Sequence, residues 1–181
     1  MVYTSPQIKI YMKIPKSYRN PKIFFDKSKL NGKGMFTNEV IKKGEIILIW
    51  GGEWNIDYTD EIGLPKAIID KKHYIKWDDN LYSIEYDGED PNYFINHSCN
   101  PNSWLIDNFT LVARRNIKRG EEITADYSTW ETGEYKSKWL CKCGSKNCRK
   151  IITGNDWKHK YFQSTYTNHT TGLVKKLIEN G

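Results

Sequence analysis

Short apolar runs, rather than long helical repeats, dominate the hydrophobic pattern of this chain. The clearest run is 45–50, which is rich in β-branched residues and is bounded by Gly44 on one side and by Gly51 and Gly52 on the other. An apolar run enclosed by turn residues in this way predicts a buried strand. The same reasoning predicts three more strands, at residues 23–25, 81–86 and 110–113.

Helical periodicity is scarce. Residues 59–72 could form a helix interrupted at Pro65, and a short helix is predicted near the C-terminus. Four apolar residues share one face of that second helix: Leu173, Val174, Leu177 and Ile178. The sequence Asn-Gly-Lys-Gly at 31–34 predicts a turn with unusual backbone freedom. We therefore expect a mainly β (β-rich α+β) single domain, followed by a cysteine-bearing extension and a tail.

The composition is that of a globular protein of one domain. The chain has 181 residues, of which 38% are hydrophobic and 28% charged. Aromatic residues reach 14%, more than a core of this size needs, so we expect some rings to line a pocket. No apolar run approaches the roughly 18–20 residues of a membrane span, and residues 1–13 lack the apolar stretch of a secretory signal. These features predict an intracellular protein, of the nucleus or the cytoplasm.

The net charge of +6 is unevenly distributed. Residues 1–50 carry +7, residues 51–90 carry −7 and residues 91–181 carry +6. The acidic stretch is either an ordinary solvated face or part of a groove that attracts a basic peptide. The basic flanks could make weak contacts with nucleic acid, but no periodic Arg/Lys helix or reading motif supports that function.

Three of the four cysteines fall within eight residues, at Cys141, Cys143 and Cys148, and the fourth is Cys99. Without a signal peptide, such a cluster favours metal binding over disulfides. Neighbouring thiols in Cys-x-Cys cannot easily bridge each other, and a tetrahedral zinc site uses four ligands. The competing interpretation is a set of reduced structural thiols.

Four motifs then occur in a fixed order along the chain. They are Gly32–Gly34, Trp50–Glu53, Asn96–Asn102 and Glu122–Tyr127, with Cys-x-Cys-x4-Cys following at 141–148. In this order they resemble the SET-domain protein lysine methyltransferases, and the cysteines resemble the post-SET zinc motif of that family. The resemblance covers about residues 20–152. It implies a SET-domain fold of several small sheets with a knot-like C-terminal motif loop, plus a zinc-bound post-SET extension.

The resemblance also implies a domain organisation and an activity. Residues 1–19 would be an N-terminal segment, 20–128 the SET domain with a variable insert at 53–92, 139–152 the post-SET zinc segment, and 153–181 a tail with a short helix. The family transfers a methyl group from S-adenosylmethionine to a lysine side chain, here in a histone tail or another basic protein. The alternatives are a catalytically silent SET-like binding module or a zinc-stabilised nucleic-acid-binding protein.

Site residues follow from the same resemblance. Tyr127 aligns with the catalytic tyrosine, where it would orient the lysine amine, since a free phenol with a pKa of about 10 is a poor base. Cofactor binding is expected from Gly32, Lys33, Gly34, Met35, Tyr93, Asn96, His97, Trp139 and Leu140. A lysine channel is expected from Tyr82, Ala125, Tyr127 and Trp130. One structural zinc would be bound by Cys99, Cys141, Cys143 and Cys148.

The sequence departs from the family pattern at two positions. Trp50 replaces the tyrosine of a Tyr-x-Gly motif, and Ala125 stands where many members carry the Phe or Tyr that tunes the number of methyl groups added. Either the channel is wider here, or another ring such as Tyr82 or Trp130 fills the space. We also expect part of 53–90 to border the peptide groove. The acidic candidates are Asp78, Asp79, Glu85, Asp87, Glu89 and Asp90.

Overall fold

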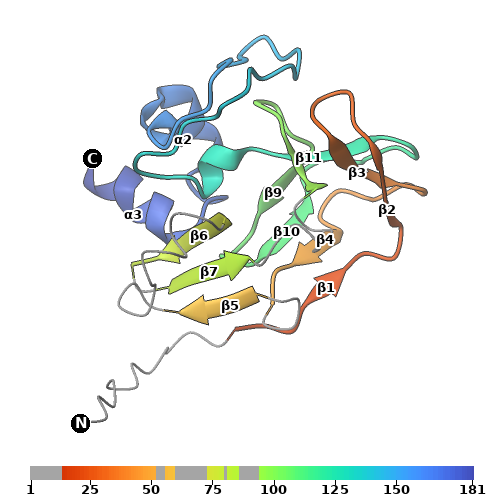
Figure 1. Cartoon of the computed structure of the whole chain (residues 1–181), viewed down its shortest axis with the longest axis horizontal. Coiled ribbons are helices and arrows are strands. Elements are labelled where there is room, and N and C mark those ends of the chain that lie inside the picture. Colours follow the sequence, from red (N-terminus) through yellow and green to blue (C-terminus); the bar gives the residue numbers. More distant parts are fainter. Residues whose placement is uncertain (1–13, 52–55, 60–72, 80, 86–93) are drawn as a thin grey trace.

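The computed structural model of the chain describes residues 14–51, 56–59, 73–79, 81–85 and 94–181 (Figure 1). The strands in these ranges are β1 (Tyr18–Arg19), β2 (Ile23–Lys27), β3 (Lys33–Thr37), β4 (Ile46–Ile49), β5 (Ile56–Thr59), β6 (His73–Asp78), β7 (Leu81–Glu85), β8 (Asn96–His97), β9 (Ser103–Leu105), β10 (Thr110–Ala113) and β11 (Glu122–Ala125). The helices are η3 (Tyr127–Thr129), η4 (Asp156–Lys158), α2 (Lys160–Tyr166) and α3 (Gly172–Asn180). The mainly β class expected from the sequence is therefore correct.

The described strands form three small sheets, in the orders β1-β4-β10-β9, β2-β3-β11-β8 and β5-β7-β6. Their pairings are antiparallel except that of β8 with β11, where Asn96 lies opposite Thr124 and His97 opposite Ala125. This parallel pair places the motif that begins at Asn96 directly beside the motif that ends at Tyr127. The topology thus joins two segments that are far apart in the sequence.

The predicted strands are confirmed at β2, β4, β7 and β10. Their apolar residues, with those of β3 and β11, form one core in which Met35, Leu48, Leu111 and Ile123 are all 0% exposed. The predicted turn at 31–34 is confirmed in its first half, because β3 already begins at Lys33. Burial of apolar side chains in this core supplies the main free energy of folding.

The predicted C-terminal helix is confirmed as α3, which begins where the Thr171 side chain accepts a hydrogen bond from the Val174 N–H. The helix predicted over 59–72 is wrong at its start, since Thr59 ends β5, and residues 60–72 lie outside the described ranges. The helix α2 was not expected, because seven residues are too few for a clear apolar period. None of the helices in the described ranges is long and apolar enough to cross a membrane.

The tail is not a loose appendage. The helices α2 and α3 form a second apolar cluster around Trp157, Phe162, Tyr166 and Val174. In Figure 1 they lie together at the left of the molecule, where α3 packs against β6. The tail therefore supports the sheet that carries β7.

Candidate functional site

Tyr127 is the first residue of η3 and is separated from β11 by Asp126 alone. The Asp126 side chain accepts a hydrogen bond from the Ser128 N–H at 3.1 Å and so caps this short helix. The Tyr127 hydroxyl donates to the backbone oxygen of Ile95 at 2.8 Å. Burial raises the pKa of Tyr127 well above its usual range, so the phenol stays neutral near pH 7. Tyr127 can therefore donate or orient, but it cannot act as a base.

Three aromatic rings surround Tyr127. Its ring centroid is 5.2 Å from that of His97, 5.5 Å from that of Trp130 and 6.1 Å from that of Trp139. Trp130 continues into the main core, with its ring 6.3 Å from that of Trp50. Tyr127 packs against both the main core and the cysteine cluster, so it lies where these two regions meet.

The other residues predicted for a lysine channel lie in two different sheets. Ala125 ends β11, is 1% exposed and belongs to the same apolar cluster as Trp130. Tyr82 lies on β7 in the three-stranded sheet, with the Lys76 ammonium 5.1 Å from its ring centroid. The structure thus brings Ala125, Tyr127 and Trp130 into one place, with Tyr82 on a separate sheet.

The side chain of Asn96 holds the turn that precedes β3. Its Nδ2 donates to the carbonyl oxygens of Asn31 at 3.1 Å and Lys33 at 3.0 Å, and to Glu122 Oε1 at 2.7 Å. Between those two carbonyls, Gly32 has a φ of 47°, in the region that favours glycine. The predicted cofactor residues of the turn are therefore fixed to the motif at Asn96.

Glu122 is a site residue to which sequence reasoning gave no role. Its carboxylate accepts hydrogen bonds from Asn96 and from Ser28 Oγ, the latter at 2.8 Å, and so joins β11 to both ends of the turn. A Cβ atom at Gly34 would collide with this carboxylate. Glu122 lies within a recognised motif, but nothing in its spacing shows that it would link three segments.

The His97 imidazole connects Tyr127 to the cysteines. Its Nδ1 accepts a hydrogen bond from the Tyr127 N–H at 3.2 Å, and its Nε2 lies 3.2 Å from Cys99 Sγ. Burial, with a smaller contribution from the Arg149 charge, lowers the pKa of His97 to about 3. The ring is therefore neutral, and since Nδ1 accepts, Nε2 carries the proton and donates to the sulfur. The side chains of Asn96 and His97 both bind the protein's own loops.

The remaining cofactor candidates differ in exposure. Trp139 lies beside His97, with ring centroids 5.9 Å apart, and the next residue, Leu140, is 62% exposed. An exposed apolar side chain next to an indole offers the kind of surface that a flat heterocycle can cover. Met35, by contrast, is 0% exposed and packs in the main core, so only its backbone could contact a ligand.

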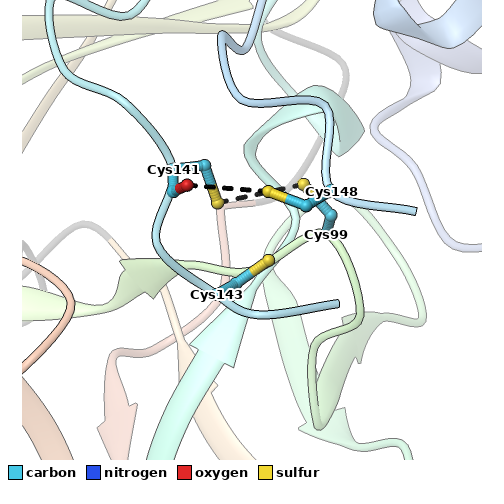
Figure 2. A group of neighbouring side chains, drawn as sticks. All are labelled: Cys99, Cys141, Cys143 and Cys148. Carbon is cyan, nitrogen blue, oxygen red and sulfur yellow. Dashed lines mark hydrogen bonds between the residues drawn. The ribbon is translucent and has the colours of Figure 1, made fainter. Parts of the chain in front are cut away.

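The four cysteines converge, with their Sγ atoms all within 4.8 Å of one another (Figure 2). Cys99 follows β8, whereas Cys141, Cys143 and Cys148 come from the extension, and all four thiols are free. A zinc ion about 2.3 Å from each thiolate would place the sulfurs about 3.8 Å apart in a tetrahedron. The Sγ atoms of Cys99 and Cys141 are 3.9 Å apart, so the cluster fits a tetrahedral metal ion.

The hydrogen bonds received by the Cys99 sulfur also suit a metal ligand. The Cys99 sulfur receives hydrogen bonds from the His97 Nε2–H and from the backbone N–H of Arg149, the latter at 3.4 Å. Such second contacts orient metal ligands. Burial raises the pKa of the free Cys99 thiol to about 11. At Cys143 desolvation acts in the same direction, but hydrogen bonds from the backbone and neighbouring thiols outweigh it and lower the pKa to about 7.

Arg149 joins three parts of the chain, and sequence reasoning missed it. Its Nη2 bonds to Asp126 Oδ1 at 2.5 Å, and its Nε lies 3.1 Å from Asp156 Oδ2. Asp126 is 2% exposed and Asp156 4%. Since Asp126 directly precedes Tyr127, this network fixes the backbone beside Tyr127 to both the cysteine segment and the tail. An arginine after a cysteine motif has no sequence signal, because its partners are distant in the chain.

Some of the residues predicted from the sequence lie outside the described ranges, and others are paired within the protein. Tyr93, Gly52, Glu53, Asp87, Glu89 and Asp90 lie outside the described residues. At the end of β6, Asp78 and Asp79 both accept hydrogen bonds from Lys176 Nζ of α3, at 2.6 and 2.7 Å. Two of the acidic residues expected beside a peptide groove are therefore paired within the protein.

Comparison with known sequences gives matches along most of the chain. A model of the SET domain family matches residues 32–128, more than half of the chain. Histone-lysine N-methyltransferase ASHH3 of Arabidopsis thaliana is 31% identical over 179 residues, covering 83% of this chain and 47% of the relative. Histone-lysine N-methyltransferase trithorax of Drosophila virilis is 32% identical over 138 residues, covering 70% of this chain and 3% of the relative. The chain thus spans about half of the first relative and a small part of the second.

The fold has a counterpart among solved structures. It is similar to the methyltransferase domain of human Histone-lysine N-methyltransferase SETMAR, with a TM-score of 0.52 and 21% identity. That match covers 70% of this chain and 55% of the other. The matched family region runs from the turn before β3 to η3, and so includes Asn96, His97 and Tyr127. The chain belongs to the SET domain family.

Proposed function

We propose that this protein is a lysine methyltransferase, which transfers a methyl group from S-adenosylmethionine to a lysine side chain of a histone tail or another basic protein. One observation supports this most strongly. Tyr127 is a neutral phenol held by its hydroxyl at the junction of the apolar core and the cysteine cluster. Family membership and the names of the relatives agree with it.

The residues around Tyr127 suit the two requirements of this chemistry. When bound, S-adenosylmethionine supplies a methyl group bonded to a sulfonium sulfur. An uncharged amine can attack the methyl carbon and displace the sulfur. The rings of Trp130 and Tyr127 would exclude water from a lysine side chain and lower its pKa by desolvation. The Tyr127 hydroxyl would orient the amine, and correct orientation supplies much of the rate in such a displacement.

Two groups of residues would bind the methyl donor. The turn at 31–34, held by Asn96, would contact its polar end, and Trp139 with Leu140 would cover its adenine. The exposed apolar surface of Leu140 is the feature that favours this arrangement. Met35 would contribute backbone groups alone.

A zinc ion bound by the four cysteines would have a structural role. It would attach the extension to Cys99 and so bring Trp139 to His97 and Tyr127. With four thiolates as ligands it keeps no open position, so it would not take part in the chemistry directly. A histone substrate would place the protein in the nucleus, the first of the two expected compartments.

The direct test is transfer of radiolabelled methyl from S-adenosylmethionine to protein substrates. Core histones, intact nucleosomes and a lysine-rich peptide would be incubated with the zinc-loaded protein. A matched peptide in which every lysine is replaced by arginine is the control. We expect label in the lysine substrates and none in the arginine peptide.

The outcomes separate the candidate functions. Label in the arginine peptide would contradict the assignment to lysine. Absence of label from histones, nucleosomes and whole-cell lysate would favour a silent binding module of the same fold.

A further inference from the structure

The segment that carries three of the four cysteines is strongly basic. Residues 136–160 contain eight Lys/Arg residues and one acidic residue, Asp156. That carboxylate is 4% exposed and paired with Arg149, so it does not neutralise the surface. The preceding segment, 94–135, contains four basic and six acidic residues. Between residues 94 and 160, the excess of positive charge therefore begins where the extension begins.

The lysines of this segment are all exposed. We call them the basic surface: Lys136, Lys138, Lys142, Lys146, Lys150, Lys158 and Lys160. Within the described ranges, none of the seven forms an ion pair with a carboxylate. The chain does pair lysines elsewhere, since Lys22 binds Glu45 and Lys176 binds Asp78. The basic surface thus presents seven charges to the solvent.

Backbone contacts within the segment bring several of these lysines close to one another. The Cys141 N–H donates to the Lys150 oxygen at 2.7 Å, and Lys136 forms an antiparallel bridge with Thr153. A hollow of about 320 Å³ is lined by Cys99, by Asn147 and Arg149, and by residues 159–162. In Figure 1 the segment forms the blue loop at the top edge of the molecule, at the opposite end from β5.

The composition of the basic surface favours nucleic acid over protein as its partner. Lysine ammonium groups are point charges on flexible stems, which suit the phosphates of a nucleic acid but carry no information about base sequence. Protein–protein interfaces are instead enriched in arginine and aromatic residues and depleted in lysine. The one arginine here, Arg149, is bound by Asp126 and Asp156. An acidic protein surface is therefore the less favoured partner.

We propose that the basic surface binds the phosphate backbone of duplex DNA without reading its sequence. Bound there, DNA would hold a DNA-associated substrate protein close to Tyr127. This second consequence rests on the proposed function, whereas DNA binding itself does not. Because the attraction is electrostatic, it must weaken steeply as salt displaces the lysines from phosphate.

The test measures binding of a fluorescein-labelled 30-base-pair duplex to the zinc-loaded chain over a range of salt concentrations. The variant is the triple charge reversal Lys136→Glu, Lys142→Glu and Lys146→Glu. We expect its affinity to fall at least ~10-fold and its salt slope to fall by about 1 for each lysine that contacts phosphate. Zinc content and thermal unfolding show whether the fold is kept; if it is not, the same three positions are changed to Gln.

A matched control removes the same charge elsewhere: Lys27→Glu, Lys42→Glu and Lys43→Glu, all of them exposed. This control should lose much less affinity. Equal losses in the two triple variants would reduce the effect to net charge and overturn the proposal, as would absence of DNA binding by the unmodified chain. Tighter binding to a polyglutamate peptide than to DNA would also overturn it, in favour of an acidic protein partner.

Methyl transfer provides a separate readout. The triple variant should methylate a free peptide within about twofold of the unmodified rate, and nucleosomes much more slowly. If no substrate at all is methylated, the proposed function fails while the DNA-binding result still stands. The two proposals can therefore fail independently.

Discussion

The motif loop at 94–127 and the cysteine segment at 139–150 both contribute to the candidate site, but different forces hold them. In the motif loop, residues 95–99 are all buried, and the parallel pairing of β8 with β11 fixes the backbone. In the cysteine segment, Cys141 is the one buried residue. The other buried members of its apolar cluster are Cys99 and Ile152, and the rings packed against them, Tyr127, Tyr135 and Trp139, are only partly buried.

This difference shows how the site is assembled. The motif loop is stabilised by the apolar core and by buried hydrogen bonds, so it should form without a metal. The cysteine segment buries too little to hold Trp139 beside Tyr127 by itself, so it should depend on the ion. Tyr127 packs against both the apolar core and the cysteine cluster, so its position depends on both regions.

Removal of the metal should have the largest effect, and it should affect the cysteine segment far more than the motif loop. Cys143→Ser, or treatment with a zinc chelator, should abolish methyl transfer while the strand core still unfolds cooperatively, because the ligands hold only the segment. Elemental analysis, activity and thermal unfolding are measured together, with Asn147→Ser, an exposed position in the same segment, as the control. Full activity in protein with far less than one zinc per chain would contradict the dependence.

Loss of the Tyr127 hydroxyl should have the next largest effect. Tyr127→Phe should lower kcat by about 10- to 1000-fold, since it removes a positioned polar group from a dry site. The free energy of unfolding should change by only about 1 kcal/mol, for one lost hydrogen bond to Ile95. Tyr18→Phe, on exposed β1, is the control and should leave kcat unchanged. Normal turnover of Tyr127→Phe would show that the active site lies elsewhere.

The turn at 31–34 tests whether the motif loop serves the methyl donor. Asn96→Ala removes three hydrogen bonds and leaves Glu122 without one of its donors, so the turn should loosen. We expect the affinity for S-adenosylmethionine, measured by calorimetry, to fall about tenfold, with zinc content unchanged. The exposed Asn38→Ala serves as the comparison. An unchanged affinity would mean that the turn does not contact the donor.

If Ala125 lies in the lysine channel, the space beside it should set the number of methyl groups added. This side chain is small, is 1% exposed and belongs to the same apolar cluster as Trp130. The protein should therefore proceed beyond monomethylation, and Ala125→Tyr should shift the products towards monomethyl-lysine. Mass spectrometry at saturating methyl donor measures the distribution. If Ala125→Tyr fails to fold because the core is overpacked, adding Trp130→Phe makes room. Purely monomethyl product from the unmodified enzyme would indicate that Trp130 already narrows the channel.

The smallest predicted effect concerns the pH dependence of the stability of the strand core. Hydrogen bonding to Lys22 lowers the pKa of Glu45 from 4.5 to about 2, with the Lys42 N–H contributing. The folded pKa is depressed, so this carboxylate stabilises the fold above pH 4.5 and loses that contribution as the pH falls towards 2. Acid unfolding of Glu45→Gln should therefore depend less on pH over this interval than that of the unmodified protein. A steeper dependence would contradict the assignment.

Sequence reasoning identified those parts of the candidate site in which chemistry imposes a local pattern. Tyr127 and the four cysteines lie in motifs with fixed spacing, and the strand at 46–49 has a continuous apolar run. Arg149 and Glu122 could not be found in this way, because each acts through partners that only the folded chain brings close. Likewise, Lys176 neutralises Asp78 from a helix almost a hundred residues away, which a count of charges along the chain cannot show.

The ion pairs of Arg149 have a consequence for the order in which the chain becomes competent during synthesis. Asp126 is buried next to Tyr127, and its counter-charge, Arg149, is synthesised directly after the last cysteine of the motif. Asp156, which balances the same guanidinium, follows later still, together with the helices that pack behind it. A nascent chain that ends before residue 149 holds this carboxylate in its interior with the Ser128 N–H as a donor but with no counter-charge, which opposes closure of the fold there. Residues that follow the cysteine motif in the chain therefore complete the surroundings of Tyr127.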